Sequence, residues 1–341
     1  MTKSKNVLIW LPSPLGDAIM ATPAMRAFRS LFKDAKITCL GPAFTRQILS
    51  PSPFCDQWLD QEKSLLKNIR MLRSGNYDTC VLLKNSFSSA FVVRCSGTRR
   101  RVGYARDGRS FLLTDRIRPL RTDDRKYKPA PMIDYYLKLA EHLGADVESR
   151  KPELSTASDD VNAVLEKFDN LKSPAKPLAI LVPGGAFGPS KLWPIERYAA
   201  LADRLSETYQ ANVILSVAPV KEEIEIAESI CKLASSSPIN LGYTSLNGGQ
   251  LKALYSLADL VITNDTGPRH IAIALNKPVV SLFGPNNPQW TQTGHEKEIQ
   301  IIGKAPCVPC DKPICAQNQH LCMESITVDA VFEAAANYLN A

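Results

Sequence analysis

The chain has 341 residues, of which 45% are hydrophobic and 22% are charged, and its formal net charge is +7. This composition is typical of a globular protein of about two domains and excludes disordered, collagen-like and coiled-coil chains. No apolar run approaches the roughly 18 residues that a membrane-spanning helix needs, and residues 7–11 are too short for the core of a signal peptide. We therefore expect a cytoplasmic protein, whose mild positive charge favours anionic ligands over nucleic acid.

The first half of the chain alternates between short apolar runs and segments with apolar residues at helical spacing. The pattern predicts strands at residues 6–11, 36–40 and 77–83, and helices at residues 18–32 and 131–143.

The same alternation starts again after a segment rich in proline and lysine, residues 171–177, which indicates a linker. The second half contains predicted strands 178–182, 212–217, 260–263 and 279–283, and predicted helices 193–209, 220–234, 246–257, 270–275 and 327–339.

Strands that alternate with helices predict an α/β protein with parallel, doubly wound sheets. Two such blocks predict two Rossmann-like domains that face each other across a cleft. We set them at residues 1–165 and 175–325, with a C-terminal helix in residues 326–341. Ligands of such sheets bind beyond the carboxyl ends of the strands, so the loops after the strands are the candidate sites.

The loop after the first strand contains Gly16 and Asp17. Glycine allows a tight turn there, and an aspartate that opens a helix can simply be a cap. The alternative interpretation makes Asp17 a general base.

Two later loops have the composition of a site for phosphate groups. The first, residues 183–194, contains Gly184, Gly185 and Lys191, whose backbone amides and ammonium group can surround an anion. It matches neither the dinucleotide fingerprint nor the P-loop. The second loop runs from a predicted strand into a predicted helix and contains Asp265, Thr266, Gly267, Arg269 and His270.

Two further charged groups are candidates for ligand contact. Glu222 or Glu223, at the start of a predicted helix, can accept hydrogen bonds from ribose hydroxyls or can be ordinary acidic residues of a first helical turn. Arg99, Arg100 and Arg101 lie in a basic stretch that is either a solvated surface or a site for an acidic acceptor or lipid head groups.

Four of the nine cysteines lie close together near the C-terminus: Cys307, Cys310, Cys315 and Cys322. Four thiolates can hold a structural zinc ion, but the spacing is irregular and lacks a second close pair. Packed or free thiols are the competing interpretation.

Several of these segments, in this order, resemble glycosyltransferase family 9, the ADP-heptose:lipopolysaccharide heptosyltransferases. They are LGDAIMATPA (residues 15–24), PGGAFGPSKLWP (183–194), TNDTG (263–267) with His270, and LFGP (282–285). The resemblance covers nearly the whole chain, and its second and third segments are closer to the heptosyltransferase II branch.

The resemblance implies a GT-B fold that binds the acceptor in the N-terminal domain and the donor in the C-terminal domain, with the last helix packing back toward the N-terminal domain. It implies inverting transfer of a heptose from ADP-heptose to a lipopolysaccharide inner-core or related glycan acceptor, without a catalytic metal or other cofactor. Because that acceptor is linked to lipid, peripheral contact with the anionic inner face of the inner membrane is expected.

The resemblance also implies roles for single residues. Asp17 matches the proposed catalytic base, Lys191 the lysine on the donor phosphates, and Asp265 the acid that contacts the heptose. Thr266, Gly267 and His270 match the donor-phosphate loop, where Arg269 departs from the commonest pattern of the family and adds a guanidinium. Glu222 or Glu223 falls near the ribose-binding acid.

The residues leave other functions open. A transferase or epimerase that uses another nucleotide sugar has the same phosphate-binding requirements. A catalytically degenerate nucleotide-binding regulator is a third interpretation.

Overall fold

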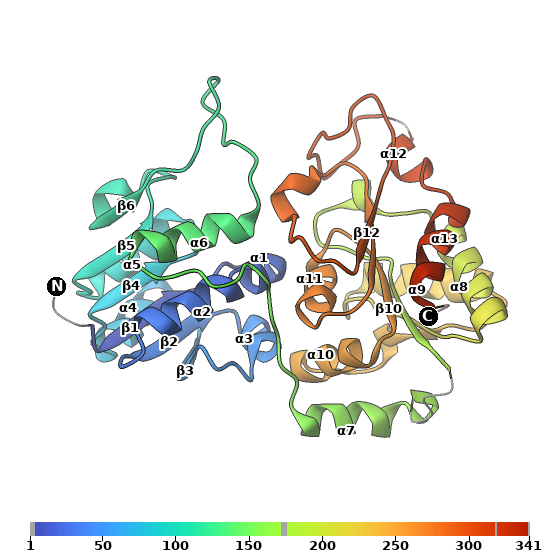
Figure 1. Ribbon diagram of the computed structural model, residues 1–341, viewed down its shortest axis with the longest axis horizontal. Helices are drawn as coiled ribbons and strands as arrows, with labels where there is room; N and C mark the ends of the chain where they lie inside the picture. The colour runs from blue at the N-terminus through green and yellow to red at the C-terminus, as the bar shows by residue number, and fades with distance from the viewer. Residues whose placement is uncertain (1–3, 172–175, 318, 340–341) are drawn as a thin grey trace. The chain divides into compact units, whose positions relative to one another are not determined.

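The computed structural model describes residues 4–171, 176–317 and 319–339 (Figure 1). The chain divides into two compact units. Unit 1 comprises Met1–Glu153 with Gln289–Thr293, and unit 2 comprises Leu154–Pro288 with Gly294–Ala341. The division thus falls before residue 165, because helix α7 (Ser158–Lys167) packs on α10 (Gly248–Leu257) of unit 2. Residues 172–175 of the predicted linker lie outside the described ranges.

Unit 1 is built on a six-stranded sheet in the order β3-β2-β1-β4-β5-β6, with every neighbouring pair parallel. The strands are β1 (Asn6–Trp10), β2 (Lys36–Gly41), β3 (Gln57–Asp60), β4 (Thr79–Leu82), β5 (Arg100–Tyr104) and β6 (Asp115–Ile117).

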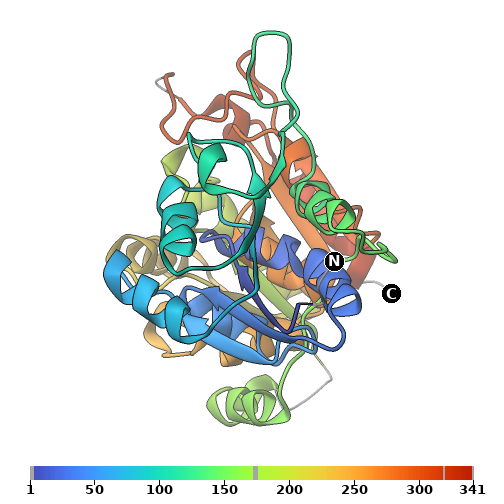
Figure 2. The ribbon, with the colours of Figure 1, turned by 90° about the vertical axis from the view of Figure 1, so that its left-hand side faces the viewer.

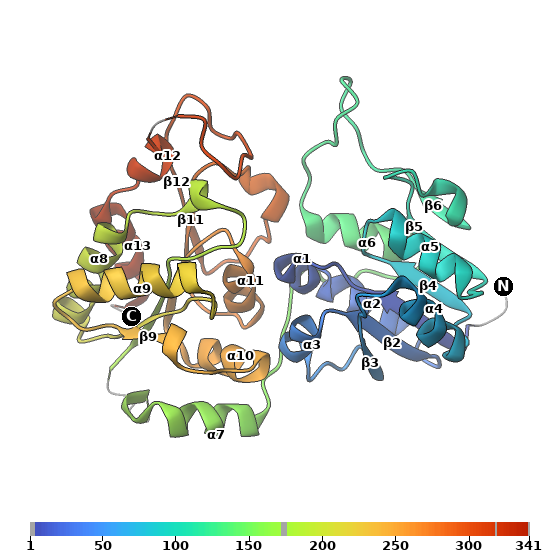
Figure 3. The same ribbon diagram turned by 180° about the vertical axis from the view of Figure 1, so that it is seen from behind.

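Helices cover both faces of this sheet. One group contains α1 (Leu15–Met20), α2 (Thr22–Leu31) and α6 (Met132–His142), which contact one another, while α3 (Ala43–Leu49) packs beside α1 and β3. The other face carries α4 (Leu65–Ser74) and α5 (Phe87–Cys95), which lie side by side (Figure 3) over a core that includes Leu8, Cys80 and Leu82.

The helix predicted at residues 18–32 is two helices. The break falls at Ala21, and α2 then begins with Thr22 and Pro23. Proline has no backbone N–H and fits the first turn of a helix but not its interior. Beyond β6, a hairpin closed by a bridge between Arg121 and Tyr127 projects from the unit (Figure 2).

Unit 2 repeats the plan with a second parallel six-stranded sheet in the order β12-β11-β10-β7-β8-β9. Its strands are β7 (Leu178–Val182), β8 (Asn212–Leu215), β9 (Ile239–Asn240), β10 (Leu260–Asn264), β11 (Val279–Phe283) and β12 (Glu298–Ile302). Its other α-helices are α8 (Ile195–Tyr209), α9 (Lys221–Leu233), α11 (Gly267–Ala274), α12 (Leu321–Glu324) and α13 (Val328–Leu339). Short 3-10 helices occur at η1 (Ser110–Leu112), η2 (Asp169–Leu171), η3 (Pro189–Lys191), η4 (Leu241–Tyr243) and η5 (Pro288–Thr291).

Numbered within its own unit, each sheet has the strand order 3-2-1-4-5-6 of a doubly wound dinucleotide-binding fold. The predicted α/β class with two Rossmann-like domains is therefore confirmed. In such a sheet successive strands are added first on one side of the first strand and then on the other, so the strand order reverses between the first and fourth strands, and ligands bind at that point. Here the loops in question follow β1 in unit 1, and β7 and β10 in unit 2.

The C-terminal helix α13 packs on α8 and on the sheet of unit 2. Its buried residues Val331 and Ala335 belong to the apolar core beneath α8. The rings of Phe332 and Tyr209 stack with centroids 5.8 Å apart, so α13 is held by α8. No helix within the described ranges is both long and apolar enough to cross a bilayer.

Candidate functional site

The glycine-rich loop after β7 brings Lys191 to the carboxyl edge of the unit 2 sheet. The Lys191 side chain is buried, and its Nζ donates a 2.6 Å hydrogen bond to the backbone oxygen of Asp265. The Phe187 ring centroid lies 4.5 Å from Nζ. Burial lowers the pKa of Lys191, and the Asp265 carboxylate opposes that shift. The loops after β7 and β10 therefore meet at this ammonium group.

Asp265 is the centre of a buried cluster of charged and polar groups. Its Oδ1 lies 3.1 Å from Arg269 Nη1 and 4.0 Å from His270 Nε2, and its Oδ2 lies 3.7 Å from Lys191 Nζ. The amide of Asn286 also donates to Oδ2, at 3.4 Å. Two cationic groups thus hold one carboxylate in place at the end of β10.

Arg269 is fully buried, and its second partner is a residue that the sequence analysis missed. Its Nε and Nη2 donate to Oε1 and Oε2 of Glu298, at 2.6 and 3.1 Å. Burial by itself raises the pKa of Glu298, but the Arg269 guanidinium and hydrogen bonds from Ser281 and Gln300 outweigh it and lower that pKa. All three nitrogens of the guanidinium therefore donate to protein carboxylates, Nη1 to Asp265 and the other two to Glu298. Glu298 begins β12, which the sequence analysis did not identify.

His270 follows in the first turn of α11. Burial lowers its pKa to about 3, and the Arg269 charge adds to that effect, so the imidazole is neutral at pH 7. Its Nδ1 is buried and has no hydrogen-bond partner among the described residues. A neutral ring nitrogen of this kind can serve a ligand as a hydrogen-bond partner.

The two glycines of the loop allow close approach of its neighbours. A Cβ on Gly184 would overlap the Glu223 carboxylate, and a Cβ on Gly185 would lie 2.7 Å from Thr266 Cγ2. Glu223 accepts hydrogen bonds from the backbone N–H groups of Gly185 (3.2 Å) and Ala218 (2.7 Å). Glu222 is exposed on α9, so Glu223 is the carboxylate of the pair that lies at this loop.

In unit 1, Asp17 lies in the first turn of α1, directly beyond the carboxyl end of β1. It is partly buried, and its charge acts on Tyr136 of α6, whose pKa is raised first by burial and then by Asp17. The chain places the carboxylate here because Pro14 precedes the helix with an extended backbone.

The three consecutive arginines lie at the opposite edge of the unit 1 sheet, since Arg100 begins β5 and the strands are parallel. Arg100 forms a 2.7 Å ion pair with Asp115, and Arg101 donates to the backbone oxygens of Leu112 and Thr98. Arg99 is exposed. This position is at the other edge of the sheet from the Asp17 loop, and contact of these arginines with an acidic acceptor or with lipid head groups stays a prediction.

The cysteine-rich segment packs against the glycine-rich loop. The Ser190 hydroxyl donates to the backbone oxygen of Lys312, and a Cβ on Gly188 would overlap the backbone oxygen of Pro313. Within the ranges that the structure covers, no three His, Cys, Asp or Glu side chains gather as a metal site needs. Cys322 is buried in the apolar core and Cys307 is exposed, and the zinc site that the sequence left open finds no support among the described residues.

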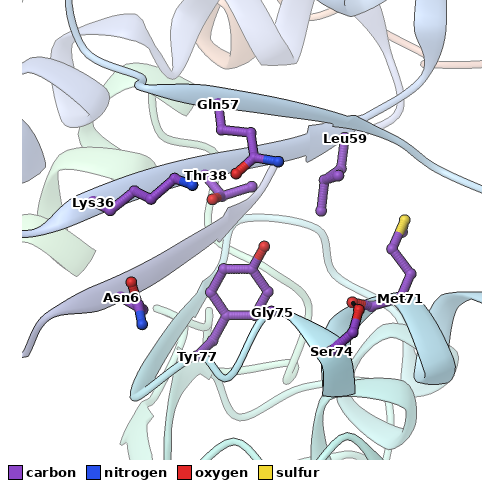
Figure 4. Close-up of a pocket in the computed structure, with 9 residues that line it drawn as sticks. All are labelled: Asn6, Lys36, Thr38, Gln57, Leu59, Met71, Ser74, Gly75 and Tyr77. Carbon is purple, nitrogen blue, oxygen red and sulfur yellow. Dashed lines mark hydrogen bonds between the residues drawn. The ribbon is translucent and has the colours of Figure 1, made fainter.

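A cavity of about 450 Å³ in unit 1 is separate from all of these residues (Figure 4). Asn6, Lys36 and Gln57 line it and begin β1, β2 and β3, so it opens at the amino edge of the sheet. The Tyr77 hydroxyl is directed toward Thr38 in its wall. It therefore lies away from the edge that carries Asp17.

Comparison with known proteins identifies the family. Residues 65–320 match the model of glycosyltransferase family 9 (heptosyltransferase). The chain belongs to this family. The resemblance inferred from the sequence motifs is thus confirmed, and the protein is a member of a family of glycosyltransferase enzymes.

Full-length relatives of this family carry the heptosyltransferase 2 name. The chain is 30% identical to lipopolysaccharide heptosyltransferase 2 of Escherichia coli strain K12, over 96% of this chain and 97% of that protein. The solved structure of E. coli ADP-heptose lps heptosyltransferase II matches with a TM-score of 0.80 at 26% identity, covering 98% of both chains. A glycosyltransferase family 9 structure from Veillonella parvula matches the fold with a TM-score of 0.83 at 20% identity, covering 98% and 97%.

Proposed function

We propose that this chain transfers a heptose from ADP-heptose to a lipopolysaccharide inner-core or related glycan acceptor. The observation that carries the proposal is the buried cluster of Lys191, Asp265 and His270 at the carboxyl edge of unit 2. It lies at the reversal point of a doubly wound sheet, where such folds bind nucleotides. The full-length similarity to heptosyltransferase 2 proteins supports heptose as the sugar.

The donor diphosphate needs positive charge and hydrogen-bond donors as negative charge grows on it during departure. We assign this part to Lys191, to the backbone of the first turn of α11 at Thr266 and Gly267, and to the neutral imidazole of His270. The hydrogen bond of Lys191 Nζ to the backbone oxygen of Asp265, and the Asp265 carboxylate beside it, keep one ammonium group at a defined position.

Asp265 is our candidate for contact with the heptose, and Arg269 positions it from behind. The Asn286 amide on the other carboxylate oxygen limits its rotation further. Glu223 is our candidate for the ribose, because it lies at Gly184 and Gly185 whereas Glu222 is exposed.

Transfer with inversion is a single in-line displacement in which the acceptor oxygen bonds to the anomeric carbon as the bond to the diphosphate breaks. The acceptor hydroxyl must lose its proton to a base in that step. We assign the base to Asp17, in the first turn of α1 in unit 1. As the family resemblance implies, the proposed reaction uses no catalytic metal. We place the enzyme in the cytoplasm, at the face of the membrane that carries its lipid-linked acceptor.

The test is a panel of donors. The purified chain is mixed with ADP-heptose, UDP-sugars and GDP-sugars, and binding is measured by calorimetry and turnover by release of the nucleoside diphosphate. Selective binding and turnover of ADP-heptose, with turnover lost in Asp17→Asn, is the expected result. Preference for UDP or GDP would discard the donor assignment, and binding without any turnover would favour a regulatory nucleotide-binding protein.

A further inference from the structure

The outer face of α5 carries a cluster of exposed aromatic rings. Phe87, Phe91 and Phe111, which we call the phenylalanine patch, are 46%, 40% and 70% exposed. The ring centroid of Phe87 lies 6.4 Å from that of Phe91 and 6.1 Å from that of Phe111. Phe87 and Phe91 are one helical turn apart on α5, and Phe111 comes from η1, which packs on α5. Contiguous aromatic surface that is left exposed marks an interaction site.

Basic side chains emerge on the same face of the unit. Residues paired across parallel strands point to the same side of a sheet. Arg101 is paired with Cys80, which belongs to the core beneath α4 and α5, so Arg101 points to the face that carries α5. Arg116 is paired with Gly103, and Gly103 is paired with Leu82, which belongs to the same core. Arg116 therefore also points to the face that carries α5.

A third arginine, Arg94, is exposed on α5 one turn beyond Phe91. Burial lowers the pKa of Arg101, and the charge of Arg94 adds to that effect, so the two guanidinium groups are neighbours. Arg101 also donates to the backbone oxygen of Leu112, next to Phe111, at 2.7 Å. The basic groups therefore border the aromatic rings.

Acidic groups are scarce around the patch. From residue 84 to residue 118 the chain has nine basic and two acidic residues. Asp107 is paired with Arg106 and Asp115 with Arg100, so arginines take up both carboxylates.

The neighbouring helix extends the same surface. Helix α4 lies beside α5 (Figure 3) and begins with Leu65 and Leu66, which are 47% and 66% exposed. It contains no acidic residue. The face is thus apolar at the start of both helices and basic around α5, while at the start of α4 the exposed Glu62 carboxylate lies 3.9 Å from Lys67.

We propose that the phenylalanine patch docks the protein on an anionic lipid bilayer. The aromatic rings would enter the interface between head groups and acyl chains, and Arg94, Arg101 and Arg116 would contact the head-group phosphates. Charge complementarity selects this occupant over a second copy of the chain, because a two-fold interface would bring the same arginines together. The idea that this bilayer also carries the lipid-linked acceptor rests on the proposed function. Binding of the protein to lipid can be measured without any sugar transfer.

The experiment is co-sedimentation of the full chain with vesicles of phosphatidylcholine alone or mixed with phosphatidylglycerol. The test variant is Phe87→Ser/Phe111→Ser. Its matched control, Phe44→Ser/Tyr243→Ser, removes aromatic rings of nearly equal exposure, 45% and 69%, from elsewhere on the molecule. Arg94→Glu is compared in the same way with Lys232→Glu on α9, and thermal unfolding verifies that each variant is folded.

We expect the chain to bind the anionic vesicles. The double serine variant and Arg94→Glu should each bind them about tenfold more weakly, while both controls bind like the unmodified chain. Two results would overturn the inference: a chain that does not sediment with anionic vesicles, or a double serine variant that binds as before. If the unmodified chain does not bind vesicles but forms a dimer, and the double serine variant is a monomer, the patch is assigned to self-association instead. Absence of heptose transfer with vesicle binding intact would count against the proposed function alone.

Discussion

Arg269 and Glu298 form a buried two-point ion pair that links α11 to β12. Nε to Oε1 is 2.6 Å and Nη2 to Oε2 is 3.1 Å, and the third nitrogen, Nη1, lies 3.1 Å from Asp265. One arginine therefore connects a structural carboxylate to the carboxylate that we assign to the sugar.

Breaking this pair on one side should be costly. Glu298→Gln removes the carboxylate charge that faces Arg269 Nε and Nη2 and leaves the buried guanidinium with Asp265 alone, so we expect the free energy of unfolding to fall by about 3–5 kcal/mol. Urea denaturation measures it. The double variant Arg269→Met/Glu298→Leu, which removes both charges, should recover most of that stability and still turn over donor poorly because Asp265 is no longer oriented. A Glu298→Gln variant as stable as the unmodified chain would contradict this account.

Replacing Asp17 by asparagine should separate catalysis from donor binding. Loss of a general base lowers the rate by about a hundredfold to ten-thousandfold, so transfer by Asp17→Asn should fall within that range. ADP affinity measured by calorimetry should stay within about twofold, because the donor residues are on other elements. Glu62→Gln removes an exposed carboxylate of unit 1 and serves as the control. Loss of ADP binding in Asp17→Asn would rule out the assigned role.

Lys191→Gln should weaken both donor binding and turnover. The buried ammonium group is the positive charge that we assign to the diphosphate, and charge-assisted contacts of this kind are worth about 1.5–3 kcal/mol. We therefore expect at least about a tenfold loss of ADP affinity by calorimetry, with a larger loss of rate. Lys304→Gln, at an exposed position of unit 2, should change neither. An unchanged rate in Lys191→Gln would remove this residue from the site.

His270 should make stability depend on pH. Its pKa of about 3 in the folded chain lies below the roughly 6.5 of an unfolded histidine. Below about pH 6.5 the unfolded chain therefore binds a proton that the folded chain does not, and stability falls by up to about 1.4 kcal/mol per pH unit. His270→Asn should reduce the slope of the unfolding free energy against pH between about pH 5 and pH 7. This pH range lies above the one in which Glu298 titrates, because the pKa of Glu298 is lowered. Equal slopes for the two proteins would show that His270 is not held neutral.

Gly188 should tolerate no side chain. Its φ of 146° is strained for other residues, and a Cβ would also overlap the backbone of Pro313. Gly188→Ala should therefore displace the loop that carries Lys191, with an ADP affinity about tenfold lower. Gly97→Ala is the control, because φ is 90° there and the added Cβ would meet no neighbouring atom. This variant has backbone strain without a steric overlap, and it should leave ADP binding unchanged. Equal ADP affinity in both variants would show that the contact with Pro313 is unimportant.

The sequence motifs predicted the fold class and the candidate loops, because each motif consists of residues that are close together in the chain. The apolar run of β1, the turn at Gly16 and Asp17, and the glycine-rich loop ending at Lys191 all lie within a few residues. Alternating strands and helices then restrict the sheet to a parallel, doubly wound form, so the motifs are expected at its carboxyl edge. The family followed from the order of those motifs.

The tertiary structure decided what depends on partners distant in sequence. Glu298 is 29 residues from Arg269, and it becomes the partner only because β12 is added beside β11 at the edge of the sheet. The strand order likewise sends Arg99–Arg101 to the amino edge, although their composition had suggested an acceptor site. Phe87 and Phe111 form one surface only after η1 packs on α5. Charge and burial of a side chain depend on which elements pack around it, and local sequence does not contain that information.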